Sequence, residues 1–414
     1  MTALSRRFLT MAALLLAGCG GATDPDPAGP PPLLERLPRN LSGAETAAIA
    51  ASNGFAFDLL GRATAAQPGA NVFLSPLSVT MALGMVMNGA RGETRDAMAT
   101  TLGFGSLPQA DINQGYRSLI DLLSDLDSEV EFTIANSLWT RQGYPVLAPF
   151  TADARQYFDA EARSLDFGSP GAVDVINDWV KTKTNGKIPT ILNSIRQEEI
   201  LFAVNAIYFK GRWRTQFKPA DTRPGTFTKA GGGSQSVSFM HRTEDTPYFR
   251  GQDFELVDLW YGAGAHTLTV ILPAAGTTAA ALATRFTAGE FAAAVGSLHT
   301  TKVDLAFPKL RLEYQRSLGQ DLIALGMGVA FSDGANFRGI ADDDLVITRV
   351  DHKTFVDINE EGTEAAAATN VGVGVTSLPQ TVTVRVDRPF LVAIRERLSG
   401  TVLFLGLVAE IPTT

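Results

Sequence analysis

Apolar residues between positions 42 and 64 recur at the three- and four-residue spacing of a single helix face. This periodicity predicts an amphipathic helix over residues 42–64. A second helix is predicted to begin at Ser75 and Pro76, because serine caps a first turn and proline is tolerated within it. Residues 79–87 are almost wholly apolar, which indicates a helix buried on most sides. Asn88 and Gly89 then provide a C-terminal cap.

Most other apolar runs are short and rich in β-branched or aromatic residues, which is typical of strands. The predicted strands cover residues 130–138, 202–209, 268–272, 303–307, 346–349, 354–358, 381–386, 390–394 and 401–408. Helical stretches are predicted at residues 173–184 and 316–325. Because strands and helices do not alternate regularly, the pattern favours the α+β class. No second linker or internal repeat divides residues 42–414, so we expect a single domain there.

The N-terminus differs in composition from the rest of the chain. A basic pair, an apolar run and small residues precede Cys19, so residues 1–18 are typical of a secretory signal peptide. The ending Leu-Ala-Gly-Cys resembles a bacterial lipobox, in which the cysteine is acylated; a plain signal peptide that carries a cysteine is the alternative. Residues 19–41 are rich in Gly and Pro and are predicted to form a tether. We therefore expect an exported lipoprotein of the cell envelope, anchored to a membrane through Cys19 on its periplasmic or extracellular side.

Charge and motif content restrict the function further. The chain has 35 Lys and Arg against 43 Asp and Glu, a formal charge of −8, and no basic run, which disfavours nucleic acid as a partner. The single cysteine allows no internal disulfide, and the four histidines lack metal-ligand spacing, so no metal or cofactor is expected. Nucleophile-elbow and phosphate-loop motifs are missing. We expect a protein that is not an enzyme.

Several blocks of residues, in order along the chain, resemble the serpin family of serine protease inhibitors. They include residues 71–78 (NVFLSPLS), 88–94 (NGARGET), 177–180 (NDWV), 204–211 (VNAIYFKG), 387–391 (DRPFL) and 400–406 (GTVLFLG). The resemblance implies three β-sheets, about nine helices and an exposed reactive-centre loop near the C-terminus. In that family a protease cleaves the loop, the loop inserts as a new strand in the main sheet, and the acylated protease is carried along and distorted.

Residues 360–379 correspond to this loop. Every second side chain from position 363 to position 375 is small or β-branched: Thr363, Ala365, Ala367, Thr369, Val371, Val373 and Val375. The other set contains Glu364 and both glycines of this stretch. A period of two is the pattern of a strand with one buried face, whereas a low-complexity linker would show no such phase. The loop therefore contains a potential strand.

The resemblance also implies a hinge at the start of the loop. The hinge residues are Glu361, Gly362, Thr363, Ala365, Ala366, Ala367 and Ala368. Their small side chains match the inhibitory members of the family, whereas non-inhibitory members commonly carry bulky, charged or proline residues there. An irreversible inhibitor that forms a covalent complex with a serine protease is therefore expected, and a non-inhibitory binding or chaperone-like serpin is the alternative.

Counting fifteen residues from Gly362 places the reactive bond between Thr376 and Ser377. The segment is about two residues longer than in well-known members, so the next two bonds, up to Pro379, remain open. No Lys or Arg lies between Gly362 and Val384, which disfavours trypsin-like targets. Small uncharged residues suit elastase-like or subtilisin-like proteases, and papain-like cysteine proteases also remain open.

Other positions match mechanical parts of the family's main sheet. Ser75, Ser78, Asn205 and His352 match the shutter, a hydrogen-bonded cluster under the sheet, and Trp213 matches the breach, where insertion begins. Heparin binding in some relatives needs a basic fourth helix, but residues 106–131 carry six acidic residues and a single arginine, Arg117. We expect a monomer that does not bind heparin.

Overall fold

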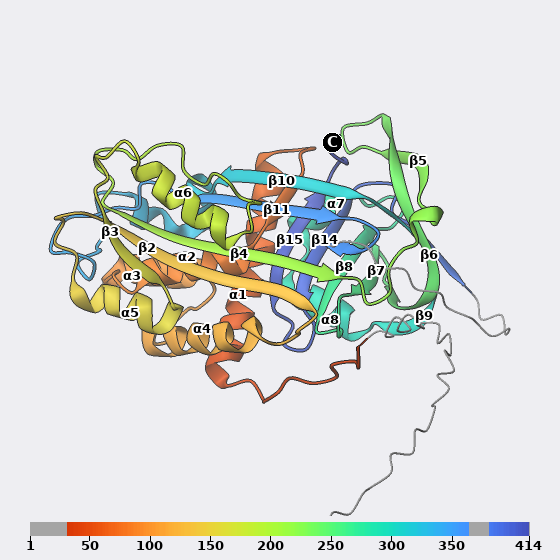
Figure 1. Cartoon of the computed structure of the whole chain (residues 1–414), viewed down its shortest axis with the longest axis horizontal. Coiled ribbons are helices and arrows are strands. Elements are labelled where there is room, and N and C mark those ends of the chain that lie inside the picture. The colour runs from red at the N-terminus through yellow and green to blue at the C-terminus, as the bar shows by residue number, and fades with distance from the viewer. Residues whose placement is uncertain (1–30, 364–380, 414) are drawn as a thin grey trace, which may run out of the picture.

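The computed structural model describes residues 31–363 and 381–413, which form an elongated body with most helices gathered toward one end (Figure 1). The helices are α1 (Gly43–Ala66), α2 (Pro76–Met87), α3 (Gly92–Thr101), α4 (Gln109–Ser124), α5 (Ala148–Phe158), α6 (Ala172–Lys183), α7 (Ala279–Arg285), α8 (Ala288–Gly296) and α9 (Gly319–Leu322). The strands are β1 (Val72–Leu74), β2 (Val130–Arg141), β3 (Glu161–Leu165), β4 (Leu201–Arg212), β5 (Arg223–Thr228), β6 (Ser234–Arg250), β7 (Phe254–Trp260), β8 (His266–Pro273), β9 (His299–Pro308), β10 (Leu310–Ser317), β11 (Asp351–Ile358), β12 (Gly362–Thr363), β13 (Val382–Arg385), β14 (Phe390–Glu396) and β15 (Val402–Val408). The predicted α+β class is confirmed.

Helix α1 begins where the sequence predicts, because Ser42 and Glu45 form a capping box. The Glu45 N–H donates to Ser42 Oγ (3.1 Å), and the Ser42 N–H donates to the Glu45 carboxylate (2.7 Å). Burial opposes ionisation of Glu45, but bonds from Arg39 and Ser42 outweigh it and lower its pKa to about 2. Helix α2 also begins as predicted, but the expected Ser75 cap is wrong: its hydroxyl donates instead to the Leu403 carbonyl oxygen (2.8 Å).

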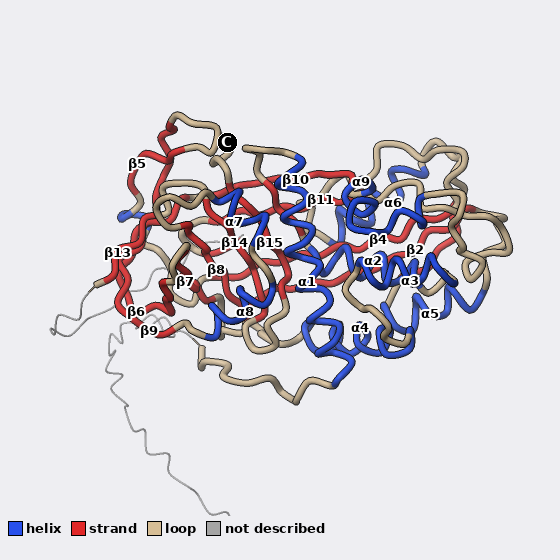
Figure 2. The backbone as a smooth tube through the Cα atoms, turned by 180° about the vertical axis from the view of Figure 1, so that it is seen from behind, coloured by secondary structure: helices blue, strands red, loops and turns tan. Residues whose placement is uncertain are grey.

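Two β-sheet systems make up the body (Figures 1 and 2). The first sheet has six strands in the order β10-β11-β12-β4-β2-β3. The second has the order β1-β15-β14-β8-β7-β6-β9-β13, with β5 on the free part of β6. Strand β6 pairs with β9 over most of its length and with β7 at its last three residues. This shared strand therefore joins two of the three expected sheets into one hydrogen-bonded system.

Both faces of the six-stranded sheet are covered. Helix α2 and the main hydrophobic core lie against one face. On the other face, Trp179 and Ile176 of α6 form a second core with Trp139 of β2 and with Val204 and Ala206 of β4. Alternate residues of β4 therefore point into different cores, as expected for a strand buried on both sides. The odd-numbered side chains of β4 face the main core.

Two predicted elements differ in the structure. Residues 346–349 form no strand: Arg349 and Thr348 instead contact Glu199 through their side chains. The helix predicted at residues 316–325 begins later, because its first two residues complete β10 and stay paired with β11. Its helical geometry is interrupted at Gly326, whose φ of 115° is accessible mainly to glycine.

Residues 31–41 contact the body, although composition predicts a tether as far as residue 41. The Leu34 N–H donates to the Ala263 carbonyl oxygen (2.8 Å), and Arg397 donates to the Leu34 carbonyl oxygen. Arg214 donates to the Pro31 carbonyl oxygen (2.7 Å). Composition alone missed these contacts because they are made mostly by backbone groups of a proline-rich segment.

Candidate functional site

The predicted hinge begins a strand within the six-stranded sheet. Gly362 and Thr363 form β12, which pairs antiparallel with Arg212 and Gly211 of β4. On its other side Thr363 pairs with Ile358 of β11. Among the described strands, β12 is the element that joins β4 to β11. The sheet thus has a strand position between β4 and β11 whose first two places the hinge fills.

Only glycine fits at the first of these places. Gly362 has a φ of 155°, and a Cβ built on it would lie 2.1 Å from the Gly211 carbonyl oxygen. No side-chain movement can relieve a contact with backbone. The glycine that marked the hinge in the sequence is therefore required by the close approach of β12 to β4.

Thr363 occupies a closed, neutral site. Its side chain is 2% exposed, and its hydroxyl lies 2.8 Å from that of Tyr261. Burial raises the pKa of Tyr261, so this phenol stays protonated. The Tyr261 ring stacks on Trp213, the predicted breach residue, with 4.4 Å between ring centroids. Trp213 donates its ring N–H to the Asn359 carbonyl oxygen and its backbone N–H to the Glu361 carbonyl oxygen, both at 2.8 Å. The breach residue thus holds the chain just before the hinge.

Glu360, next to the hinge, is held by residues between strands, among them Lys309 between β9 and β10. Its carboxylate pairs with Lys309 (2.9 Å) and accepts a bond from Thr222 (2.8 Å). The Phe217 N–H donates to the Glu360 carbonyl oxygen (2.9 Å). Burial opposes ionisation of this carboxyl, but the bonds from Lys309 and Thr222 outweigh it and lower its pKa. Both the side chain and the backbone of Glu360 are therefore held immediately before the chain enters the sheet.

The predicted shutter residues fall into two separate groups. In the first, the Ser75 N–H donates to His352 Nε2 (3.1 Å), which requires a ring that is unprotonated at that nitrogen. Burial lowers the pKa of His352 to about 4. Nearby, Asn71 accepts bonds from the backbone N–H groups of Ala409 and Glu410. This group ties β11 to the start of α2.

In the second group, Ser78 Oγ donates to the Asn205 carbonyl oxygen (3.4 Å). Asn205 donates its side-chain amide to Asn136 (2.7 Å), which lies opposite it on β2 and in turn donates to the Phe158 carbonyl oxygen. The Asn205 Oδ1 is buried, and no group of residues 31–363 or 381–413 donates a hydrogen bond to it. The second group thus ties α2 to β4 and β4 to β2.

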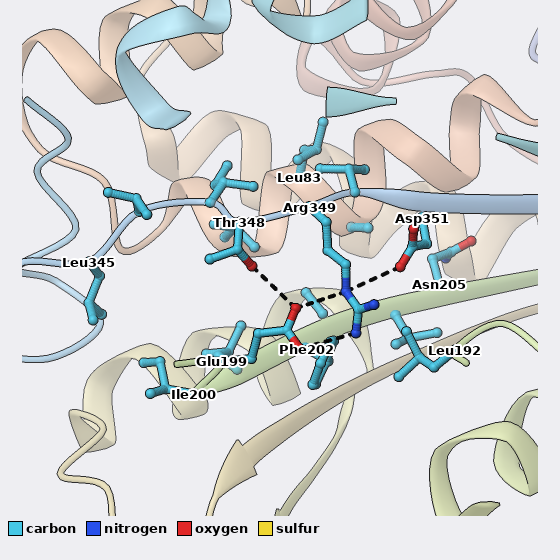
Figure 3. Close-up of a pocket in the computed structure, with 18 of the residues that line it drawn as sticks. Leu83, Leu192, Glu199, Ile200, Phe202, Asn205, Leu345, Thr348, Arg349 and Asp351 are labelled. Carbon is cyan, nitrogen blue, oxygen red and sulfur yellow. Dashed lines mark hydrogen bonds and ion pairs between the residues drawn. The ribbon is translucent and has the colours of Figure 1, made fainter. Parts of the chain in front are cut away.

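A cavity of about 330 Å³ is lined by residues of both groups, among them Asn205 (Figure 3). It lies between β4 and the segment that leads into β11, and both Asn205 and His352 border it. Most of its wall is apolar, as at Leu83 of α2 and Ile200 before β4. Strand β12 lies between the C-terminal ends of β4 and β11, and the cavity lies nearer their N-terminal ends. The cavity is therefore in line with the strand position that β12 begins.

Sequence reasoning missed several partners of these residues. Tyr261 carries no motif signal, because it lies about a hundred residues from the threonine that it contacts. Lys309 belongs to a Phe-Pro-Lys block and could have been proposed from the resemblance. Asn136 could have been noticed as a polar residue within a predicted buried strand. The other partners of the site residues come from strands that are distant in the sequence.

Some predicted site residues lie outside the described residues: Cys19, Ala365, Ala366, Ala367, Ala368, Thr376 and Ser377. Within residues 31–363 and 381–413, no group of three or more His, Cys, Asp or Glu side chains is placed to hold a metal ion. No helix of that same part of the chain has the length and apolar content needed to cross a bilayer.

Comparisons with known proteins agree with this architecture. A family model described as "Serpin (serine protease inhibitor)" matches residues 50–411. Iripin-2 of Ixodes ricinus is 35% identical over 369 residues, which cover 87% of this chain and 93% of that protein. Corticosteroid-binding globulin of Ovis aries is 33% identical over 362 residues, which cover 86% and 83%.

Solved structures give the same result. Tengpin, a thermophilic serpin in its native state, has a TM-score of 0.82 at 29% identity, covering 93% of this chain and 98% of that one. Human thyroxine-binding globulin in complex with its hormone has a TM-score of 0.82 at 28% identity, covering 90% and 100%. With the family model matched from within α1 to beyond β15, the chain belongs to the serpin family.

Proposed function

We propose that this protein is an irreversible suicide-substrate inhibitor of serine endopeptidases. A target protease cleaves the reactive loop, and its serine forms an ester with the residue before the broken bond. The freed loop then extends the strand that β12 begins, and the bound protease is carried along the sheet. Trapping succeeds when insertion is faster than hydrolysis of the ester. The chain is consumed as an inhibitor and has no catalytic role of its own.

The observation that carries this proposal is the pairing of β12. If the two ladders continue without a shift, each loop residue meets a definite partner on β4 and on β11. The side chains in phase with buried Thr363 are then the small and β-branched set that ends at Val375. The outward set includes Glu364. The loop sequence therefore suits the strand position to which it is already attached.

We further propose that the reactive bond is Thr376–Ser377 and that the targets are elastase-like or subtilisin-like. A small uncharged residue before the bond fits a shallow specificity pocket, and the proline directly after Leu378 makes the Leu378–Pro379 bond a poor substrate. Papain-like cysteine proteases are a second target class. The mass of the C-terminal peptide released on cleavage identifies the bond directly.

The test uses the whole chain with Cys19→Ser, which removes the acceptor for a lipid. This protein is incubated with a pancreatic-type elastase and, separately, with a subtilisin, and then boiled in detergent and separated on a gel. We expect a band near the summed masses, which is a trapped acyl-enzyme. Cleavage without such a band, together with an unchanged melting temperature of the cleaved chain, would show that the loop does not insert.

The second candidate function is ligand binding without protease trapping. It is favoured by the similarity to proteins whose names describe hormone binding, such as corticosteroid-binding globulin. Such a protein would be cleaved as an ordinary substrate by both proteases. The small hinge residues and the strand β12 favour inhibition instead.

We also propose that Cys19 carries the lipid that anchors the exported chain to the cell envelope. Its support is the lipobox-like ending of the predicted signal peptide. Growth of a bacterial host with labelled palmitate should label the parent chain and leave Cys19→Ser unlabelled. Equal labelling of both chains, or of neither, would contradict this proposal.

A further inference from the structure

Charged side chains connect the loop before β4 to the segment that enters β11 (Figure 3). The Arg349 guanidinium contacts the Glu199 carboxylate through Nε (2.9 Å) and Nη2 (3.2 Å). Arg349 also donates to the Ser194 carbonyl oxygen (2.7 Å) and lies 3.4 Å from Asp351. Glu199 lies two residues before β4, and Arg349 lies two residues before β11, so the two face each other across the strand position. We call this contact the Glu199–Arg349 bridge.

Glu199 has a second cationic partner that does not cross the gap. Arg196 donates its backbone N–H (2.7 Å) and its guanidinium (3.0 Å) to the same carboxylate. Arg196 and Glu199 both belong to the loop before β4, so their pairing is local. The two arginines thus differ in position: Arg196 pairs with Glu199 within one loop, whereas Arg349 reaches Glu199 from the opposite side of the cavity, as does the weaker contact of Thr348 (3.4 Å).

The surroundings of the Glu199–Arg349 bridge make separation of its two charges costly. Glu199 is 3% exposed, and the Arg349 guanidinium lies 5.2 Å from the centre of the Phe202 ring. Apolar residues line most of the cavity beside it. A carboxylate in such surroundings strongly favours paired charge over separation, because little water can replace the lost partner. The free-energy cost of separating Glu199 from Arg349 therefore opposes widening of the sheet at this end.

The ladder registers show when insertion reaches the bridge. Continuing the antiparallel pairing of Gly362 with Arg212 puts Val375 opposite Glu199. Continuing the pairing of Thr363 with Ile358 puts Gly372 opposite Arg349. An inserted strand separates its two neighbours by roughly twice 4.8 Å, which exceeds a direct salt-bridge geometry between adjacent edges. The loop can therefore enter as far as Val371 before the bridge must open.

We propose that the Glu199–Arg349 bridge is a latch that holds the lower half of the strand position closed and sets the rate of the last stage of loop insertion. This role rests on the proposed inhibitory function. The latch lets the early part of the loop enter and resists complete insertion of an uncleaved loop. It thereby keeps the protein in the form that still presents its loop to a protease.

The test measures spontaneous insertion of the uncleaved loop in the whole chain with Cys19→Ser. The protein is incubated without protease at a temperature at which the parent converts within hours. Samples are scored for resistance of the loop to elastase and for resistance to unfolding in urea. Arg349→Gln and Glu199→Gln should each convert at least about tenfold faster, equivalent to ~1.4 kcal/mol of lost barrier.

Two variants separate a latch from a general loss of stability. Arg196→Gln removes the other guanidinium from Glu199 without opening the gap, and Arg349→Lys keeps a cation that can reach Glu199. Both should convert within about threefold of the parent rate. The latch is overturned if Arg349→Gln converts no faster than the parent, or if Arg196→Gln accelerates conversion equally.

The melting temperature of the cleaved parent is measured in parallel. A large rise shows that the loop inserts, so equal conversion rates among the variants would then overturn the latch alone. No rise would overturn the proposed function, and the role of the latch with it.

Discussion

Thr363→Arg is the substitution that tests the hinge most directly. Thr363 is the first hinge residue whose side chain is buried in the sheet, and it contacts a protonated phenol instead of a charge. The arginine side chain is longer by several atoms and is always charged. The site can accept neither the volume nor the charge, so the hinge of the variant should stay out of the sheet.

The expected size of the effect follows from the cost of burying charge. A buried charge without a partner costs about 3–5 kcal/mol in proteins. Placed on the barrier to insertion, even ~3 kcal/mol slows that step by roughly a hundredfold. Hydrolysis of the acyl-enzyme is unaffected and therefore wins. The variant should be cleaved as a substrate, and the number of inhibitor molecules consumed for each protease inactivated should rise by at least about tenfold.

Glu364→Arg is the matched control, because it carries the same new side chain one residue further along. The alternation of the loop gives position 364 the outward phase, where an arginine stays solvated. Titration of an elastase with each variant measures the stoichiometry, and a denaturing gel shows complex or cleaved chain. Complex formation by Thr363→Arg at the parent stoichiometry, or equal failure of both variants, would refute the inward phase of Thr363 and with it the predicted insertion register.

Three further predictions concern the hinge and the shutter. Gly362→Ala should expel β12, because its Cβ would meet the Gly211 carbonyl oxygen, and amide hydrogen exchange at position 363 should become faster. Tyr261→Phe leaves a buried hydroxyl unpaired and should lower the free energy of unfolding in urea by about 1–3 kcal/mol, with Tyr261→Phe/Thr363→Val recovering most of it. The pKa of His352 is lowered by burial to about 4, so the unfolded chain binds this proton first as pH falls. Stability should therefore decline between about pH 6.5 and pH 4, by up to ~3 kcal/mol, and His352→Gln should flatten this part of the pH profile.

Local sequence signals predicted the elements that depend on neighbours along the chain. The start of α1, the proline that opens α2 and the apolar run of β4 all appear where the pattern indicated. These features depend on contacts within a few residues, which a sequence displays directly. Gly362 was also recognised as a hinge residue, although its physical reason, the approach to Gly211, needed the sheet.

Contacts across the strand position could not be predicted in the same way. Residues 346–349 have the β-branched composition of a strand. In the structure, however, the Arg349 guanidinium binds Glu199, some 150 residues away. Periodicity describes which residues tend to be buried, and it does not say which strand will be the neighbour. The strand was predicted from composition where the sheet in fact leaves a cavity.

The two halves of the shutter show how the sheet and the loop were matched to each other. Asn205 on β4 and His352 on β11 border the same cavity, and within the described part of the chain no group donates to the Asn205 Oδ1. Continued along β4, the β12 register reaches Asn205 at loop position 369; continued along β11, it reaches His352 at the same position. That position is Thr369, which carries a hydroxyl and stands between small residues of the inward set. A hydroxyl can donate to an amide oxygen and accept from a neighbour, so a loop inserted in this register would bring a matching polar group to the shutter.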